Sequence, residues 1–180
     1  DADNLGLGEA LEILAIQNTL HCMDELAPHA YVTINTSPAH ILSGAINNVL
    51  KDVDCTRIIL EVTEHSPITN YQAMRSALEP LRAKGVKLAI DDVGAGFSSF
   101  QHILELEADI IKLDISLTQN INNDRRKFLL AKALCGFAKA INCSIVAEGI
   151  ENEDELFTLR KLNVDNVQGY FIGRPAPIIE

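Results

Sequence analysis

Short apolar runs alternate with helix-like segments six times along the chain, and this alternation constrains the fold more than any other feature. The predicted strands cover residues 31–34, 57–62, 88–91, 109–114, 144–147 and 164–167. The predicted helices cover residues 5–27, 39–51, 67–83, 97–106, 121–141 and 152–162. Continuously apolar strands that alternate with helices are typical of a parallel sheet with both faces covered. The sequence therefore predicts an α/β fold.

Two of the helices carry finer predictions. In helix 5–27 the apolar residues are predicted to lie on or near one face, namely Leu5, Leu11, Leu14, Ile16, Leu20 and Met23. In helix 67–83, Pro67 lies near the predicted start and Gly85 lies just past the predicted end. These predictions say which helical residues pack inward and where the helices stop.

The absence of two glycine-rich motifs narrows the choice of parallel fold. The chain has no GxGxxG after its first strand and no GxxxxGK[ST], so a doubly wound nucleotide-binding fold is disfavoured. A (β/α)₈ barrel of the TIM type is the better prediction, with its active site at the carboxyl ends of the strands. A closed barrel has eight strands and about 250 residues. With six predicted strands in 180 residues, we expect one partial domain over 1–180, an incomplete barrel whose first two strands are missing.

Charge and cysteine usage exclude several classes of protein. The net charge of −10 disfavours a nucleic-acid polymer as partner, although it permits a small phosphate ligand held through metals. No apolar run is long enough for a membrane span and no signal peptide is recognisable, so we expect no membrane contact by this domain. The four cysteines lack metal-ligand spacing and are interpreted as reduced thiols in the cytoplasm. The histidines show no HExxH pattern, which disfavours zinc.

Every predicted strand ends in a polar side chain that can bind metal or transfer protons. The residues are Asn35, Glu61, Asp91 with Asp92, Lys112 with Asp114, Glu148 and Gln168. One such residue is an ordinary loop residue, but six consecutive strands with this property are hard to explain as caps and turns. Because the active site of a barrel lies at the carboxyl ends of its strands, these side chains are predicted to meet there.

Asp91 and Asp92 are the most demanding of these residues. Two adjacent carboxylates repel each other, and each costs free energy to desolvate unless positive charge lies between them. A divalent cation meets this need, and oxygen ligands favour Mg²⁺ or Mn²⁺. The alternative is a solvated Asp-Asp turn that caps the next helix.

Other strand-end residues also have ordinary alternatives. Lys112 lies between two apolar residues of a strand, and a buried lysine is costly unless it is paired with acids or functional. Asn35 is also compatible with a helix cap, and Gln168 with a loop amide. These alternatives stay open at the level of the sequence.

The order of the strand-end motifs resembles that of the EAL-type cyclic di-GMP phosphodiesterases, from residue 2 to residue 177. The matching segments are Asn35 in INTS, Glu61 and Glu64 in a Glu-x-Thr-Glu, the pair Asp91-Asp92 before a Gly-Ser-rich loop, Lys112 and Asp114 in a Lys-x-Asp, Glu148-Gly149 with Glu151, and Gln168-Gly169-Tyr170 with Arg174-Pro175 behind it. Several short motifs in the same order make the resemblance specific.

The chain departs from the family at the motif that gives the family its name. Glu9-Ala10-Leu11 lies on a predicted helix and lacks the Arg-Trp that follows the family motif, so it is not that strand. The naming strand and its metal-binding Glu are therefore expected to be absent, and we expect little or no activity from this chain alone. Smaller differences from the family are Val93 in place of Phe, Phe97 in place of Tyr, and Ile115 in place of the usual Arg.

The resemblance implies hydrolysis of cyclic di-GMP to linear pGpG by a two-metal mechanism with Mg²⁺ or Mn²⁺. It implies metal ligands at Asn35, Glu61, Asp91, Asp92 and Glu148. The implied catalytic side chains are Glu148 as base or second-metal ligand, Lys112, Asp114 and Gln168. Substrate contacts are implied for Gln168, Gly169, Tyr170, Arg174 and Pro175, and control of a loop and a dimer for Glu64, Gly94, Gly96, Ser98 and Ser99.

The resemblance also implies partners and leaves alternatives. Cyclic di-GMP is the expected ligand, and a homodimer through the helices beside the Gly-rich loop is expected. The domain is expected in the cytoplasm, and membrane anchoring of a parent protein stays open. The competing hypothesis is a non-catalytic cyclic di-GMP receptor or signalling scaffold. A weaker one is an unrelated metal-dependent barrel enzyme that binds no cyclic di-GMP.

Overall fold

A computed structural model describes residues 7–94 and 99–177 of the chain. Within these residues the strands are β1 (Val32–Asn35), β2 (Ile58–Thr63), β3 (Lys87–Val93), β4 (Ile110–Leu113), β5 (Ser144–Ala147) and β6 (Asn166–Val167). The helices are α1 (Gly8–His21), the 3₁₀ helix η2 (Met23–Glu25), α2 (Pro38–Leu42), α3 (Ala45–Val49), α4 (Tyr71–Arg82), α5 (Ser99–Leu106), α6 (Ile115–Thr118), α7 (Arg125–Ala140) and α8 (Glu153–Lys161). The strands follow one another in chain order in one sheet, and every register that is defined is parallel. The predicted α/β class is confirmed.

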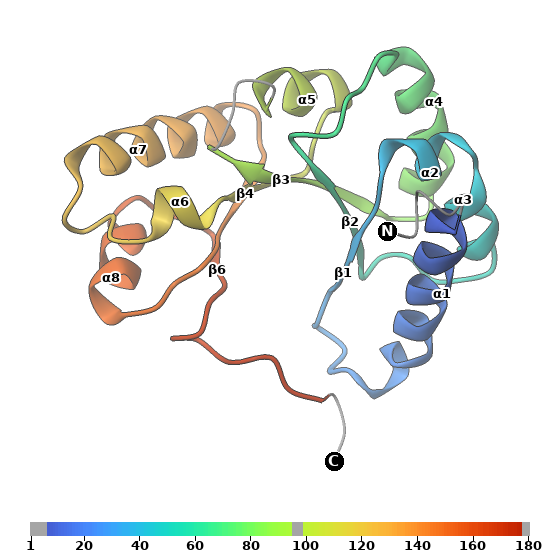
Figure 1. The fold of residues 1–180 in the computed structure, drawn as a ribbon, viewed down its shortest axis with the longest axis horizontal. Helices are drawn as coiled ribbons and strands as arrows, with labels where there is room; N and C mark the ends of the chain where they lie inside the picture. Colours follow the sequence, from blue (N-terminus) through green and yellow to red (C-terminus); the bar gives the residue numbers. More distant parts are fainter. Residues whose placement is uncertain (1–6, 95–98, 178–180) are drawn as a thin grey trace. The chain divides into compact units, whose positions relative to one another are not determined.

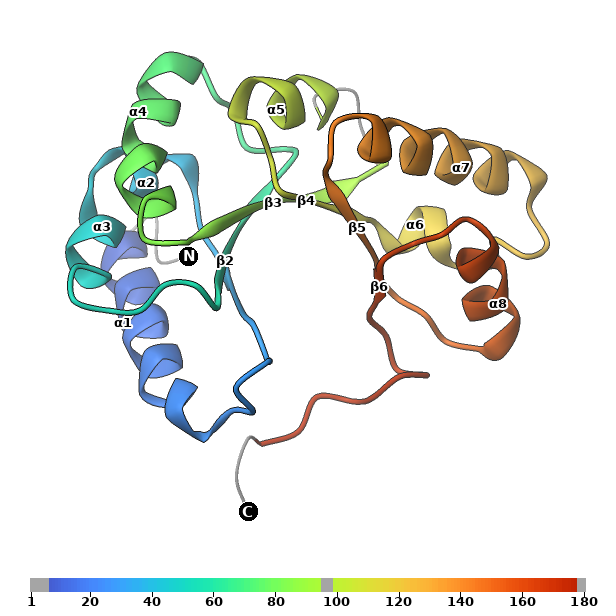
Figure 2. The ribbon, with the colours of Figure 1, turned by 180° about the vertical axis from the view of Figure 1, so that it is seen from behind.

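The chain divides into two compact units, which are described separately. Among the described residues, the first comprises 7–62, 66–88 and 177, and the second comprises 63–65, 89–94 and 99–176. In each unit the helices lie along one face of the strands (Figures 1 and 2).

The first unit pairs β1 with β2 in regular parallel register, from Val32 opposite Ile58 to Asn35 opposite Glu61. Its core is aliphatic because Ile58, Ile59, Leu60 and Val62 of β2 are buried and the helices add apolar side chains to them. The core residues include Ile16, Ile34, Ile41, Ile46, Leu50, Ile58, Leu60, Met74, Leu78 and Leu81.

The second unit pairs β3 with β4, β4 with β5 and β5 with β6. All four residues of β4 are buried, including the charged Lys112. The core residues include Ile90, Val93, Ile103, Leu106, Ile111, Leu113, Leu134, Ile145, Ile150 and Leu159. A strand that is buried along its whole length fixes the side chains at its carboxyl end, where the candidate site lies.

Several predicted helix boundaries were wrong. The segment predicted as helix 5–27 is α1, which ends at His21, followed by the 3₁₀ helix η2. The segment predicted as helix 39–51 is two short helices, because Gly44 adopts a left-handed backbone with φ 77°. Helix α4 begins at Tyr71 rather than near Pro67, because the Asn70 side chain accepts the Ala73 N–H at 2.9 Å. Helix α7 begins at Arg125 rather than at 121, with Asp124 as its N-cap. The predicted stop at Gly85 agrees with its φ of 94°.

The predicted apolar face of the first helix was also wrong. Ile16 and Met23 are buried, but Leu11 and Leu14 are 59% and 52% exposed. Leu5 lies outside the described residues. Apolar residues surround α1, so sequence periodicity does not identify the face that packs inward. Among the helices of residues 7–94 and 99–177, none combines the length and hydropathy that a membrane crossing requires.

Candidate functional site

The acid pair Asp91-Asp92 lies inside β3, in a β-bulge, and not at the end of the strand as predicted. Ile90 pairs with Ile111 and Val93 pairs with Leu113, so two residues of β3 stand opposite the single residue Lys112. Regular pairing resumes beyond the bulge, where the Asp114 N–H donates to the Val93 carbonyl oxygen at 3.1 Å. A bulge redirects side chains that would otherwise point to opposite faces of the sheet.

Local hydrogen bonds hold the bulge in place. Asp92 has φ 60°, a left-handed conformation that Asp tolerates better than most residues. Its N–H donates to Asp91 Oδ1 at 2.9 Å, and its Oδ2 accepts from the Thr63 hydroxyl at 3.2 Å. Both carboxylates therefore have fixed orientations.

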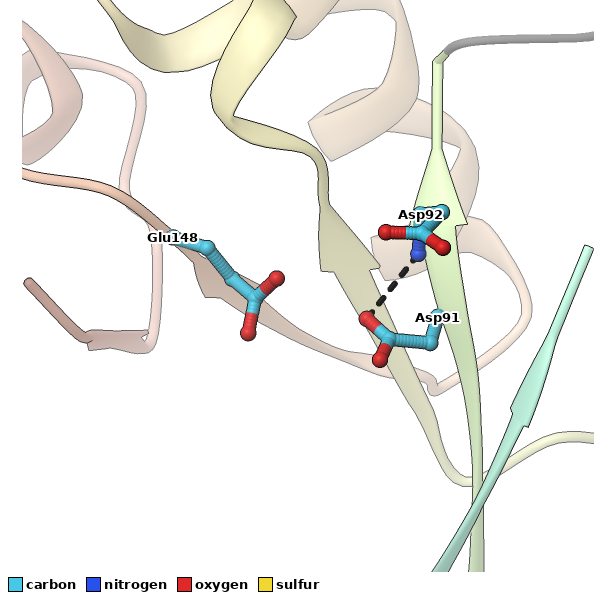
Figure 3. A group of neighbouring side chains, drawn as sticks. All are labelled: Asp91, Asp92 and Glu148. Carbon is cyan, nitrogen blue, oxygen red and sulfur yellow. Dashed lines mark hydrogen bonds between the residues drawn. The ribbon is translucent and has the colours of Figure 1, made fainter. Parts of the chain in front are cut away.

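Glu148, from the loop after β5, brings a third carboxylate to the bulge. One oxygen from each of Asp91, Asp92 and Glu148 lies within 4.8 Å of the others, and Figure 3 shows the Glu148 carboxylate extending toward the two aspartates. All three residues are partly buried. Three carboxylate oxygens at this spacing are the donor set that Mg²⁺ or Mn²⁺ prefers, so these residues fit a divalent cation.

Lys112 supplies positive charge at the same place. Its Nζ lies 3.1 Å from Asp91 Oδ2 and 2.9 Å from Glu148 Oε1, and its side chain is only 8% exposed. The expectation that a buried Lys112 is paired with acids is confirmed. The ammonium group lowers the repulsion between acids that the fold has brought together.

The backbone around Glu148 is fixed by two glycines. Gly149 has φ 68°, and a Cβ there would lie 2.3 Å from Ile115 Cγ1. A Cβ at Gly169 would lie 2.2 Å from the Ile150 nitrogen. Both positions exclude a side chain, so the loop after β5 packs tightly against its neighbours.

Asn35 and Glu61 form a separate pair in the first unit. They are register partners, with Asn35 as the last residue of β1 and Glu61 two residues before the end of β2, and the Thr36 N–H donates to the Glu61 carbonyl oxygen at 2.9 Å. Glu61 is 5% exposed. The structure thus brings these two predicted ligands together, and their participation in metal binding stays a prediction.

Glu64 contacts the start of the Gly-rich loop, and its predicted control of that loop stays a prediction. The residue is 1% exposed, its N–H donates to the Asp91 carbonyl oxygen at 3.0 Å, and its carboxylate accepts from the Gly94 N–H. Burial is the largest cause that raises the pKa of Glu64 above its ordinary value, and the nearby charge of His65 opposes this shift. Ser99 begins α5, whereas Gly96 and Ser98 lie outside the described residues.

The carboxylate of Asp114 is placed differently from the other acids. Its Oδ1 accepts the Ser116 N–H at 2.8 Å and so caps α6. Among the described residues, Asp114 is not part of the group of acids that can share a cation. Its predicted catalytic role stays a prediction.

The predicted substrate residues follow β6 and line one shallow hollow. Gln168, Gly169, Tyr170, Arg174 and Pro175 all contribute to its surface. The Arg174 guanidinium lies 4.7 Å from the centre of the Tyr170 ring, and Tyr170 is 60% exposed. The hollow offers an aromatic face and a cation, which suit a base and a phosphate.

Sequence reasoning missed two residues that support the site. Thr118, which is wholly buried, donates its hydroxyl to the Glu148 carbonyl oxygen. Glu155, which is 1% exposed, accepts the N–H groups of Asn120 and Glu151. The available signal for Glu155 was its position three residues after Asn152, in the spacing of a capping box.

Comparison with known proteins places this site in a family. A model of the EAL domain matches residues 1–175. Cyclic di-GMP phosphodiesterase PdeF of Escherichia coli (strain K12) is 30% identical over 189 residues, which cover 99% of this chain and 25% of PdeF. An uncharacterized signaling protein of Caulobacter vibrioides is 34% identical over 185 residues, which cover 98% of this chain and 23% of that protein. The chain therefore belongs to the EAL domain family, and the resemblance stated from its motifs is confirmed.

A solved structure supports the fold. The EAL domain protein of Listeria monocytogenes EGD-e superimposes with a TM-score of 0.89 at 23% identity, covering 99% of this chain and 73% of that one. The likeness confirms the predicted fold class, part of a barrel of the TIM type. The chain spans about a quarter of the length of the two curated relatives described above.

Proposed function

We propose that this EAL domain takes part in the metal-dependent hydrolysis of cyclic di-GMP to linear pGpG. The observation that carries the proposal is the group Asp91, Asp92 and Glu148, whose ligand oxygens lie within 4.8 Å of one another beside a buried lysine. Family membership supports the choice of substrate, and the relative PdeF is named a cyclic di-GMP phosphodiesterase.

The chain's own residues divide the work. A divalent cation in the group would activate water and polarise a phosphoryl oxygen. Asp91 and Asp92 would hold it, and Lys112 would donate a hydrogen bond to a non-bridging phosphate oxygen, where negative charge develops. Glu148 would act as a ligand or accept the proton of the attacking water. Asn35 and Glu61 are proposed as further ligands, since they are register partners on neighbouring strands, and a second ion, Mg²⁺ or Mn²⁺, belongs to the same proposal.

The remaining predicted roles are part of this proposal. Gln168, Gly169, Tyr170, Arg174 and Pro175 would contact the nucleotide, because they line one hollow with an aromatic and a cationic side chain. Asp114 would orient Lys112 or water. Glu64 would hold the loop that begins at Gly94, because its carboxylate accepts the Gly94 N–H.

The test is conversion of cyclic di-GMP to pGpG with Mn²⁺ or Mg²⁺, followed by chromatography. We expect turnover that EDTA and Asp91→Asn abolish in a longer protein that supplies the two strands expected to be missing, and little or no turnover by the 180-residue chain alone. Robust turnover by the chain alone would refute the second expectation. Binding of cyclic di-GMP by the longer protein without any turnover would favour the receptor hypothesis.

We also propose a homodimer. Exposed apolar side chains support it on α5, where Phe100 and Leu104 are 45% and 55% exposed, and on α7, where Leu130 is 45% exposed. The rings of Phe100 on α5 and Phe137 on α7 meet edge to face, with centroids 5.1 Å apart, so the two helices are adjacent at this point. Leu104→Glu should convert the dimer to a monomer in light scattering, and a wild-type monomer would contradict the proposal.

A cytoplasmic location is also part of the proposal. The free cysteines Cys22, Cys55, Cys135 and Cys143 support it.

A further inference from the structure

A buried threonine holds the backbone of Glu148. The Thr118 hydroxyl donates to the Glu148 carbonyl oxygen, and Thr118 is wholly buried. Its oxygen also lies 3.3 Å from the Ile115 carbonyl oxygen and 3.5 Å from that of Asp114, which are the usual partners of a helical threonine. Because a hydroxyl carries one proton, the shorter contact to Glu148 is the one that it makes. The bond joins α6 to the loop after β5.

A buried carboxylate makes a second connection between the same two segments. Glu155 Oε1 accepts the Asn120 N–H at 2.7 Å, and its Oε2 accepts the Glu151 N–H at 2.9 Å. Asn120 follows α6, and Glu151 lies three residues after Glu148. Hydrogen bonds from backbone N–H groups to a carboxylate are stronger than neutral ones, and more so away from water.

This arrangement differs from an ordinary helix start. In a capping box the third helical residue returns to the N–H of its own cap. Here Asn152 caps α8 by accepting the Glu155 N–H at 3.0 Å, but Glu155 contacts Glu151 and the distant Asn120 instead. A carboxylate that only stabilised α8 would not need the bond to Asn120.

We propose that Thr118 and Glu155 are positioning residues that hold residues 148–151 so that the Glu148 carboxylate meets Asp91 and Asp92. The inference rests on the proposed function, because it concerns the same group of acids. Thr118 and Glu155 bind the loop at backbone atoms, namely the Glu148 carbonyl oxygen and the Glu151 N–H, so both act through the backbone of the loop. A shift of the loop would move the Glu148 carboxylate away from those of Asp91 and Asp92, whose ligand oxygens now lie within 4.8 Å of it. Mutation of residues that position metal ligands commonly lowers metal affinity by about 10–100-fold.

The test uses the 180-residue chain with two readouts. Hydrogen exchange of the amides in residues 148–151 reports whether the loop is held. Titration with Mn²⁺, followed by electron paramagnetic resonance, reports whether the acids are aligned. Thr118→Val removes the hydroxyl at nearly constant shape, and we expect the exchange to accelerate and the Mn²⁺ affinity to fall, each by about tenfold.

Two variants control for loss of stability. Thr118→Ser keeps the hydroxyl and should restore both readouts. Thr158→Val removes a similar bond, since the Thr158 hydroxyl donates to the Asp154 carbonyl oxygen at 2.8 Å within α8. Thr158→Val should leave both readouts within about twofold of wild type. If Thr118→Val does not fold, Glu155→Gln is tested instead. This change replaces one carboxylate oxygen by an NH₂ group, which cannot accept the N–H of Asn120 or Glu151.

The outcomes separate the inference from the proposed function. Unchanged exchange in Thr118→Val or Glu155→Gln overturns the inference, as does Mn²⁺ affinity equal to that of Thr158→Val. Failure of the wild-type chain to bind Mn²⁺ overturns the metal site of the proposed function and the alignment of Glu148 with it. Faster exchange would then still show that the loop is held by Thr118.

Discussion

The strand pair β1–β2 and the bulge in β3 both bring polar side chains close together, but they do so with different backbone geometry. At β1 and β2, regular register makes Asn35 and Glu61 partners on neighbouring strands. At β3, an extra residue lets the consecutive Asp91 and Asp92 both approach Glu148. The first arrangement needs no unusual backbone, whereas the second uses a left-handed Asp92 and a buried lysine. Repulsion between carboxylates is strongest where they lie closest together, so a bound cation stabilises the bulge in β3 more than the β1–β2 pair.

The largest expected effect comes from removing the buried charge. Lys112→Met leaves Asp91 and Glu148 without their ammonium partner, and we expect the free energy of unfolding to fall by about 3–5 kcal/mol in metal-free buffer. Mn²⁺ should restore part of this loss, because it replaces the missing positive charge. Urea denaturation with and without Mn²⁺ measures both effects. Lys139→Met, at an exposed position of α7, is the control; an equal loss there would contradict the account.

A second experiment sharpens the comparison by replacing one acid in each region. Asp92→Asn keeps the shape of the bulge but removes a charge from the group of three. We expect the Mn²⁺ affinity to fall by about 100-fold, the upper range for residues around metal sites. Glu61→Gln makes the matching change at the regular strand end. Calorimetry on both variants, with the exposed Asp52→Asn as control, shows which region dominates; an unaltered affinity in Asp92→Asn would be incompatible with the site proposed.

The packing behind Glu148 gives a smaller effect. Gly149→Ala puts a methyl group against Ile115 and forces alanine into a left-handed backbone, so we expect a loss of about 1–3 kcal/mol. Gly136→Ala is the matched control, because a Cβ there meets open space inside α7, and it should stabilise by about 0.5–1 kcal/mol. Thermal denaturation compares them. Equal stability of the two variants would mean that the loop accommodates the methyl group.

The smallest effect concerns two cysteines near the amino end of β5, the end opposite to Glu148. Burial raises the pKa of Cys143 to about 12 and that of Cys135 to about 11. The folded thiols hold their protons more tightly than unfolded ones, so their contribution to stability is complete below about pH 8.5 and is lost as the pH rises toward 12.

Thiol labelling between pH 7 and 10 measures this shift. The rate for the folded chain should rise about tenfold per pH unit without a plateau, since the thiolate fraction does so well below the pKa. The chain in denaturant should level off near pH 9. A plateau below pH 9 in the folded chain would show ordinary thiols at these positions.

The comparison also explains what the sequence can predict. Asn35 and Glu61 come directly after apolar runs in the sequence, so locating those runs locates them, although Glu61 lies inside β2. The pairing of Lys112 with acids follows from the cost of burying a lone charge. The bulge was not predictable, because an insertion in register depends on the neighbouring strand and leaves the apolar pattern of β3 unchanged. Thr118 and Glu155 were missed because their partners are backbone groups far along the chain.

The predicted helix boundaries were wrong for a related reason. The starts at Tyr71 and Arg125 are set by Asn70 and Asp124, whose side chains compete with other polar residues nearby that have the same capping chemistry. The apolar surface of α1 is spread around the helix, so tertiary packing alone selects Ile16 as the buried residue.

A crystal of the chain soaked in Mn²⁺ tests the central claim most directly, through the anomalous signal of the metal. The account predicts an ion within about 2.0–2.6 Å of carboxylate oxygens of Asp91, Asp92 and Glu148, with the Lys112 ammonium moved away from at least one acid. Ordered carboxylates with no anomalous peak among them, at a Mn²⁺ concentration well above that used in the solution titrations, would contradict it.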